Sequence, residues 1–98
     1  MNNENNVVKE YNKYGYIKYE GKYLNGLRNG EGKEFGIINY NLGKLIFEGE
    51  YLNGERNGKG KEYDDGLLIF EGEYFNNQRW NGKGKEYHYN GNIIYEGE

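Results

Sequence analysis

The chain of 98 residues contains no cysteine, proline, serine, threonine or alanine. Without Ser, Thr or Cys it has no aliphatic hydroxyl or thiol nucleophile, no Gly-Lys-Ser/Thr phosphate loop and no Asn-x-Ser/Thr glycosylation acceptor. The lack of cysteine also excludes disulfides, thiolate zinc sites and iron–sulfur clusters. These absences argue against hydrolase chemistry, and we predict that the protein is not an enzyme.

The chain also lacks a large excess of either charge, because it has 13 Lys and Arg and 16 Asp and Glu, for a net charge of -3. This balance gives no general attraction for nucleic acid or for an anionic bilayer. No apolar stretch approaches the roughly 18 residues of a membrane span, and residues 1–10 lack the apolar core of a signal peptide. We therefore expect a cytoplasmic protein, with a membrane-peripheral location as the alternative.

Aromatic residues are what the chain has in abundance, with 12 Tyr, 4 Phe and 1 Trp. Hydrophobic residues as a whole make up only 35% of the sequence, close to the composition of disordered chains. The aromatic side chains must therefore provide most of the apolar surface that folding buries.

The sequence repeats. An aromatic-Glu-Gly-x-Tyr block begins at Tyr19, Phe47 and Phe70 and begins again at Tyr95. A second block, Asn-Gly-x-Gly-Lys-Glu-aromatic, follows each of the first three. A period in this range is typical of solenoid and repeat architectures. We divide the chain into an N-terminal extension that frays (1–8) and a repeat domain (9–98), which comprises a partial unit (9–18), three units (19–46, 47–69, 70–94) and a truncated unit (95–98).

Each unit has the pattern of a β-hairpin, because apolar residues alternate at period two and Gly, Asn and Asp punctuate the alternation. In 58–61, Gly58 and Gly60 share one face and Lys59 and Lys61 the other, so we expect aromatic rings to cover the glycines and glutamates to face the lysines. Strict alternation places Tyr63 on the lysine face, which predicts a β-bulge near Glu62. Segments 64–66 and 89–92 have the composition of tight turns.

These segments predict an all-β fold of about eight short strands in one antiparallel meander, an elongated ribbon of consecutive hairpins without a second layer. Stability then comes from aromatic rings that stack between neighbouring units. An incomplete last unit leaves an open strand edge, and open edges favour pairing. We therefore count a homodimer through the sheet edge among the expected assemblies.

The repeated motif resembles the MORN repeat (membrane occupation and recognition nexus). The likeness lies in Tyr/Phe-Glu-Gly-Glu/Lys-Tyr-x-Asn-Gly followed by Arg-Asn-Gly-x-Gly and an aromatic residue, and it covers about residues 9–98. Segment 61–72 is also similar to bacterial MORN-like variants. The chain departs from the pattern at 36–41, which adds length, at Asn77, which replaces the second glycine, and at Trp80, which is extra. The resemblance implies a non-catalytic module that contacts phospholipids, docks proteins or dimerises.

For phospholipid headgroups the candidate contacts are basic side chains of the lysine face and its neighbours. Cross-strand pairing of these lysines with glutamates 48, 50, 71 and 73 gives a mixed-sign face and weakens the field that a polybasic patch needs. We therefore rank phospholipid binding as a disfavoured alternative. The candidate residues are Arg56, Lys59, Lys61, Arg79, Lys83 and Lys85.

For a protein partner the candidate contacts are aromatic residues, because a single-layer sheet cannot bury all 17 rings and exposed aromatic surface favours interfaces. Trp80 stands out, since the repeat does not require it. The candidate residues are Tyr23, Tyr51, Tyr74, Phe75 and Trp80.

Other chemistries have weak signals. Gly58-x-Gly60 and Gly82-x-Gly84 lack the third glycine and following helix of a nucleotide loop. His88 is the only histidine, and Asp64 with Asp65 is better explained by a turn. We expect no metal ion, no cofactor and no nucleic-acid partner.

The sequence thus favours a protein-interaction module of scaffold or assembly type, which binds a protein through its aromatic face or its open edge. The alternative is a stand-alone small acidic inhibitor from a phage or mobile element that blocks a host enzyme. Both are non-enzymatic protein binders.

Overall fold

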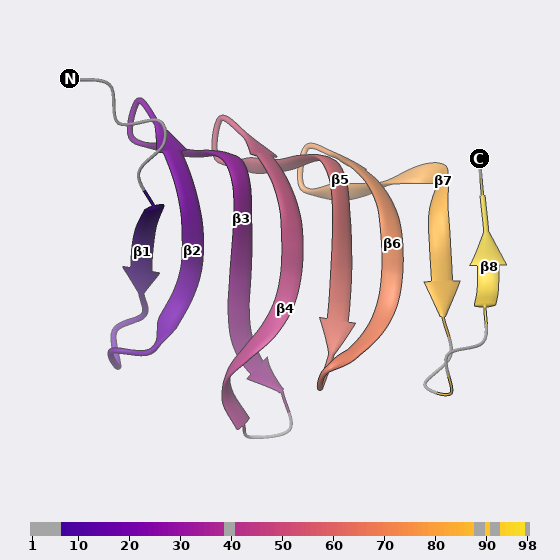
Figure 1. Cartoon of the computed structure of the whole chain (residues 1–98), viewed down its shortest axis with the longest axis horizontal. Helices are drawn as coiled ribbons and strands as arrows, with labels where there is room; N and C mark the ends of the chain where they lie inside the picture. The colour runs from indigo at the N-terminus through magenta and orange to yellow at the C-terminus, as the bar shows by residue number, and fades with distance from the viewer. Residues whose placement is uncertain (1–6, 39–40, 88–89, 91–92, 98) are drawn as a thin grey trace.

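The fold is all-β. The computed structural model describes residues 7–38, 41–87, 90 and 93–97, and Figure 1 shows a single sheet in which each strand lies beside the strands that precede and follow it. The eight strands are antiparallel, as the sequence predicts. Their bounds are β1 (Val7–Tyr11), β2 (Ile17–Leu24), β3 (Leu27–Ile38), β4 (Asn41–Leu52), β5 (Glu55–Asp64), β6 (Leu67–Phe75), β7 (Gln78–Tyr87) and β8 (Ile93–Glu96).

Strand β1 corrects the expected boundary of the N-terminal extension. Val7 pairs with Lys22 and Val8 with Gly21, so both valines belong to the sheet although we assigned them to the fraying segment 1–8. Side-chain exposure alternates from residue to residue along Val7–Tyr11, which is the period-two pattern of a strand. The remainder of that segment, 1–6, lies outside the described residues.

A row of glycines crosses the sheet. Gly32 lies opposite Gly21 on one side and Gly49 on the other, and the alignment continues strand by strand. Glycine is needed at Gly60 because an aromatic ring occupies the space of a side chain: a Cβ there would lie 2.6 Å from the Phe47 ring, and the Tyr19 and Phe70 rings are comparably close to Gly32 and Gly84. The expected cover of glycines by rings is confirmed at Gly60, whereas a Cβ on Gly58 would meet the side chain of Glu50 instead of a ring. The members of the row are Gly21, Gly32, Gly49, Gly60, Gly72 and Gly84.

The core is a line of rings on this face. Phe47 contacts Tyr51 and Tyr74 edge-to-face, with ring centroids 5.7 Å and 5.0 Å apart. Such contacts are favourable because the positive ring edge meets the negative ring face. The rings thus link each unit to the next. The buried members are Tyr19, Phe47, Tyr51, Phe70 and Tyr74.

The register shifts where the sequence predicts. A bulge separates Glu62 from Tyr63 in the β5–β6 pair, at the expected position. Tyr63 nevertheless stays on the lysine face, where its hydroxyl donates to Glu48 Oε1 at 2.7 Å. The same shift recurs at Glu34/Phe35 and at Glu86/Tyr87. The bulge is therefore a feature of the repeat.

Among the described residues, four two-residue turns join consecutive strands. Both central residues have positive φ, which favours Asn, Asp and Gly and matches the twist of a hairpin. The expected turn at 64–66 is confirmed, with φ of 51° at Asp65 and 85° at Gly66, whereas most of the turn expected at 89–92 lies outside the described residues. Asn77, at φ 70°, keeps the turn geometry that glycine has elsewhere. The four turns are Asn25–Gly26, Asn53–Gly54, Asp65–Gly66 and Asn76–Asn77.

The molecule is a thin ribbon, with extents of 45 × 32 × 17 Å. One sheet face carries the ring core and the other is polar. In the part of the chain that the structure describes, no helix is long and apolar enough to cross a membrane.

Candidate functional site

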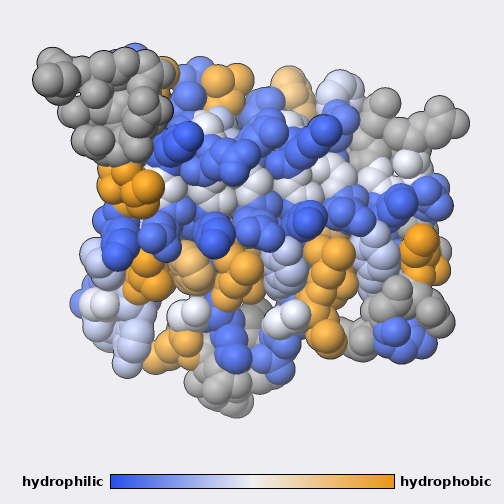
Figure 2. Space-filling view, viewed as in Figure 1, coloured by the Kyte–Doolittle hydropathy of each residue, from blue (hydrophilic) through white to orange (hydrophobic). Residues whose placement is uncertain are grey.

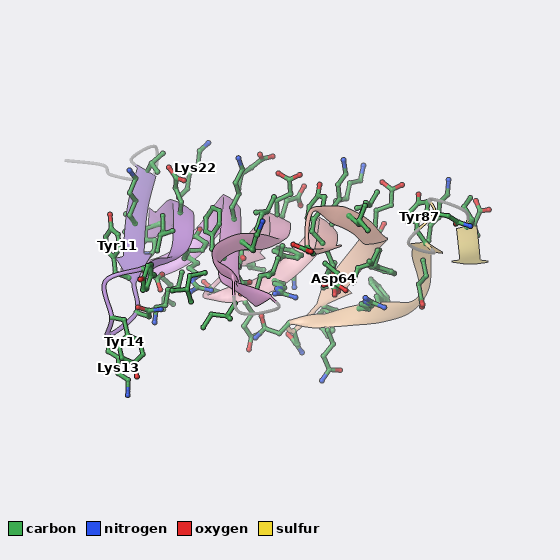
Figure 3. All side chains as sticks on the ribbon, turned by 90° about the horizontal axis from the view of Figure 1, so that it is seen from below. Tyr11, Lys13, Tyr14, Lys22, Asp64 and Tyr87 are labelled. Atoms are coloured by element: carbon green, nitrogen blue, oxygen red, sulfur yellow. The ribbon has the colours of Figure 1, made fainter. Side chains whose placement is uncertain are left out.

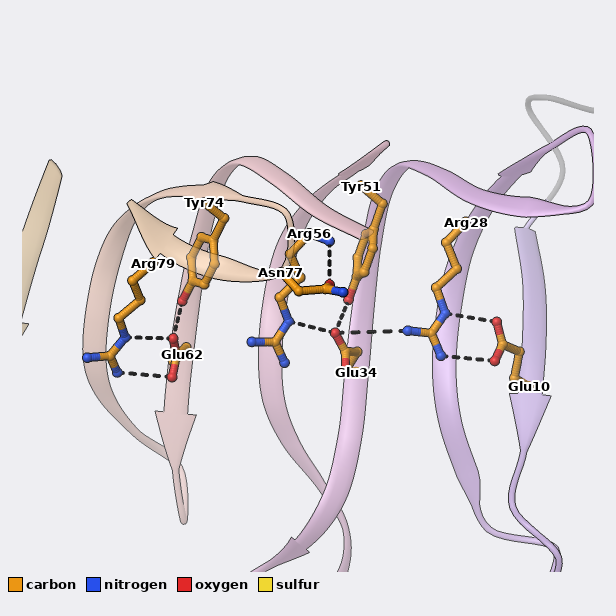
Figure 4. A network of polar contacts seen from close by, with 9 residues as sticks. All are labelled: Glu10, Arg28, Glu34, Tyr51, Arg56, Glu62, Tyr74, Asn77 and Arg79. Atoms are coloured by element: carbon orange, nitrogen blue, oxygen red, sulfur yellow. Dashed lines mark hydrogen bonds and ion pairs between the residues drawn. The ribbon is translucent and has the colours of Figure 1, made fainter. Parts of the chain in front are cut away.

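A carboxylate clamp joins each repeat to the one before it. Arg56 Nε donates to Glu34 Oε1 at 2.8 Å, and the Tyr51 hydroxyl donates to the same oxygen at 2.6 Å (Figure 4). The Arg and Tyr come from one unit and the Glu from the unit before, so the clamp forms only when the units are stacked in register. The three clamps are Glu10 with Tyr23 and Arg28, Glu34 with Tyr51 and Arg56, and Glu62 with Tyr74 and Arg79.

The clamps shift the pKa of their members. Burial raises the pKa of Glu34, but hydrogen bonds from Arg56 and Tyr51 and the charges of Arg56 and Arg28 outweigh it and leave that pKa below 4.5. Burial and the carboxylate of Glu34 raise the pKa of Tyr51. At neutral pH the clamp therefore holds an ionised carboxylate and a neutral phenol.

Each clamp arginine also covers a core ring. The guanidinium carbon of Arg56 lies 4.1 Å from the Phe47 ring centroid, and Arg28 and Arg79 lie 4.3 Å and 4.2 Å from the rings of Tyr19 and Phe70. A cation over a ring face is attracted by the ring quadrupole. These arginines therefore stabilise the stack from one side.

The structure separates the five aromatic residues expected to contact a partner. Tyr51 and Tyr74 are 3% and 2% exposed and belong to the core, and Tyr23 is half-buried with its hydroxyl on Glu10. Phe75 and Trp80 are exposed, by 56% and 52%, and their rings pack together with centroids 6.0 Å apart. Only this pair is well placed for contact with a large partner.

Trp80 is the extra residue of its unit. Arg79 pairs with Tyr74 as Arg56 pairs with Tyr51, and Gly84 pairs with Gly72. Arg79 thus holds the arginine position, and one additional residue is accommodated before Gly84. The register thus makes Arg79 the equivalent of Arg56 and leaves Trp80 as the extra residue, as the sequence indicates.

The structure also divides the six basic residues considered for headgroups. Arg56 and Arg79 lie on the ring face within clamps. Of the six, those with side chains on the opposite face of the sheet are Lys59, Lys61 and Lys85. They are in register with Glu73, Glu71 and Glu96, respectively. Lys83 lies on β7, and its side chain is outside the described part. The six therefore do not form one basic patch.

A furrow runs across the polar face, and sequence reasoning did not foresee it. Its floor is the backbone of the glycine row, seen as the pale band between two blue bands in Figure 2. The larger part has a volume of about 770 Å³ and extends from β3 past β8, and a smaller part continues to β1. Figure 3 shows Lys22 on this side of the sheet, whereas Lys13 and Tyr14 project from the other.

From β4 to β6 the walls of the furrow carry charges of alternating sign from strand to strand. On each strand one residue before the floor glycine and one after it face the furrow, and we call such a like-charged pair a gate. The gates are Glu48 and Glu50 on β4, Lys59 and Lys61 on β5, and Glu71 and Glu73 on β6. The signal was present in the sequence as Glu-Gly-Glu, Lys-Gly-Lys and Glu-Gly-Glu around the aligned glycines.

A metal site is not evident. Among residues 7–38, 41–87, 90 and 93–97, no group of three His, Asp or Glu side chains is close enough to hold an ion. His88 lies outside the described residues.

Comparisons of the chain with protein-family models, with curated proteins and with solved structures found no match.

Proposed function

We propose that the protein is a protein-interaction module that binds its partner through an apolar rim at the hairpin turns. The single observation that carries this proposal is the exposed Phe75–Trp80 pair at the β6–β7 turn. The β2–β3 and β4–β5 turns lie along the same edge of the sheet as the β6–β7 turn in Figure 1 and add exposed leucines. The apolar rim consists of Leu24, Leu27, Leu52, Phe75 and Trp80.

The rim has the composition of a binding surface. Tryptophan is enriched among residues that dominate interface energies, and adjacent apolar side chains exclude water around it. Exposed apolar side chains that gather on a small protein are also a marker of interaction sites.

We also infer that the units are MORN-type repeats. The motif spacing and the stacked hairpins support this inference, and a docking role fits it. The acidic-inhibitor alternative uses the same rim, so the identity of the bound protein separates the two: an assembly component supports the scaffold, and an enzyme that loses activity supports the inhibitor.

Two other modes of binding rank lower. Pairing at the outer strands would use β1 or β8, which have only five and four residues, and short edge strands pair weakly. Phospholipid binding would use lysines that alternate with glutamates, which cancels their attraction for an anionic surface.

Site-specific photo-crosslinking tests the proposal. A benzophenone amino acid replaces Trp80, or in the control replaces Tyr14, which is 72% exposed on the β1–β2 loop. In lysate of the source cells we expect a discrete protein adduct at position 80 and none at position 14. Excess wild type should suppress the adduct, whereas excess Phe75→Ala/Trp80→Ala should not. Equal adducts at both positions, or equal suppression by both competitors, would contradict the rim as the site.

A further inference from the structure

The furrow of the polar face offers a second binding site, independent of the apolar rim. We propose that it binds one extended peptide segment of another protein, in a polyproline II conformation, with a basic residue at every third position. The segment would lie across the strands, with its basic side chains at the glutamate gates of β4 and β6. The spacing of the gates, the width of the furrow and the charges of its walls support this ligand.

The spacing of the gates indicates the conformation of the bound peptide. Neighbouring strands are about 4.8 Å apart, so the two glutamate gates, separated by β5, are about 9.6 Å apart. In a polyproline II helix, residues i and i+3 lie on the same side and are separated by about 9.3 Å. Same-face residues of a β-strand recur at about 6.8 Å, which does not match. A Lys or Arg at every third residue therefore meets successive glutamate gates.

The furrow is wide enough for a single extended peptide chain but too narrow for an α-helix. The two walls come from residues on either side of one glycine and are about 6.8 Å apart along the strand. An α-helix with its side chains is about 10–12 Å across and would rest on the walls instead of entering. The floor consists of glycine backbone, so an extended chain can approach it closely.

The gate charges are available to a ligand. In the described part of the chain, no ion pair within 4.0 Å joins Lys59 or Lys61 to a gate carboxylate. Glu48 and Glu71 each accept a hydrogen bond from a tyrosine hydroxyl, Tyr63 and Tyr87 respectively, which fixes one carboxylate oxygen of each. The carboxylates are thus held in place while a cation can still approach from the furrow.

The lysine gate between them adds selectivity. Lys59 and Lys61 on β5 lie midway between the glutamate gates and repel a run of consecutive basic residues. An acidic residue between the basic ones instead meets this gate favourably. The best ligand therefore carries both signs with a period of three residues.

Fluorescence anisotropy with synthetic peptides tests the proposal on the purified protein. The probe is a labelled peptide of four Lys-Pro-Glu repeats, and its control has the same composition as four Lys-Glu pairs followed by four prolines. We expect the probe to bind at least tenfold more tightly than the control and to weaken as salt rises, because the contacts are ionic. Equal affinity for the two peptides would overturn the assigned conformation.

Variants of the protein locate the site. Glu50→Gln/Glu73→Gln removes one charge from each glutamate gate and should weaken binding of the probe at least fivefold. The matched control, Glu55→Gln, removes an exposed charge beside the β4–β5 turn and should leave the affinity unchanged. Circular dichroism and thermal melting verify that each variant is folded.

Other outcomes overturn the proposal. An unchanged affinity in the gate variant, or preferential binding of heparin or of phosphatidylserine vesicles over the probe, would remove the furrow as a peptide site. Because no rim residue is changed and no lysate is used, a failure here leaves the crosslinking result at Trp80 unaffected.

Discussion

Glu34 illustrates how single residues hold this thin sheet together. Its carboxylate is four-fifths shielded from solvent and accepts hydrogen bonds from the Arg56 guanidinium and the Tyr51 hydroxyl. A shielded carboxylate without partners would be costly, whereas charge-assisted bonds to an ionised carboxylate are among the stronger ones in proteins. Since the three side chains come from two units, the contact stabilises the stacking of repeats.

We predict that Glu34→Gln lowers stability at pH 7 and flattens its dependence on acid pH. The pKa of Glu34 is lowered in the fold, so its contribution is complete above the ordinary pKa of 4.5 and is lost as pH falls through the lower, folded value. The variant should lose about 1–3 kcal/mol at pH 7. Urea unfolding at pH 7, 5 and 3 measures both effects.

The control is Glu55→Gln, which removes an exposed carboxylate outside the clamps. Its stability at pH 7 should stay within about 0.5 kcal/mol of the wild type. If Glu34→Gln loses as much stability between pH 5 and pH 3 as the wild type does, the clamp carboxylate does not govern the acid response.

At the scale of the elements, the β4–β5 and β6–β7 turns are each hydrogen-bonded to a strand of the preceding unit. The Gly54 N–H donates to the Arg28 carbonyl at 2.9 Å, and the Asn77 N–H donates to the Arg56 carbonyl at 3.0 Å. Asn77 adds a bond that glycine lacks, because its Oδ1 accepts the Arg56 backbone N–H at 2.8 Å. Asn77 therefore replaces the usual glycine without loss of the turn.

We predict that Asn77→Ala destabilises the protein more than Asn77→Gly. Both variants lose the side-chain bond to Arg56, but only alanine also has to adopt a φ of 70°, which is unfavourable for it by about 1–2 kcal/mol. Thermal melting should therefore give the order wild type, Gly variant, Ala variant. Gln78→Ala, an exposed neighbour, is the control, and a Gly variant less stable than the Ala variant would contradict the backbone argument.

The elements were predictable where the signal is local. Alternation and turn residues predicted the strands, and the bulge after Glu62 was predicted at the right position although Tyr63 stays on the lysine face. The face of Arg56 could also have been found, because counting by two from Gly60 places it with the rings. The same count from Gly84 places Arg79 on the wrong face, because the extra Trp80 makes the separation five residues instead of four.

What the sequence could not provide is the register between units. The clamps and the furrow each depend on which residues of one hairpin lie opposite those of the next. Tyr51 and Tyr74 appeared as candidate contacts because composition does not reveal which rings a single layer buries. The buried rings are those that lie over the glycine row, and this row becomes evident only when the strands are aligned.

The whole molecule is coupled along one dimension. In this meander each strand pairs only with its sequence neighbours, so the ring stack is the main side-chain connection between distant units. Stability of such a chain is approximately the sum of unit and nearest-neighbour interface terms. The Phe47 ring is central, because it contacts Tyr51 of its own unit and Tyr74 of the next.

We predict that Phe47→Leu uncouples the two ends of the ribbon. The smaller side chain loses both edge-to-face contacts, which should lower stability by about 1–2 kcal/mol. In native-state hydrogen exchange, amides of β2 and β3 should then open with a different free energy from those of β6 and β7, whereas in the wild type they open together. The control, Phe75→Leu, changes an exposed ring, and in this variant the amides of all four strands should still open with the same free energy. If protection falls uniformly in Phe47→Leu, the backbone ladder alone carries the cooperativity and the ring stack does not.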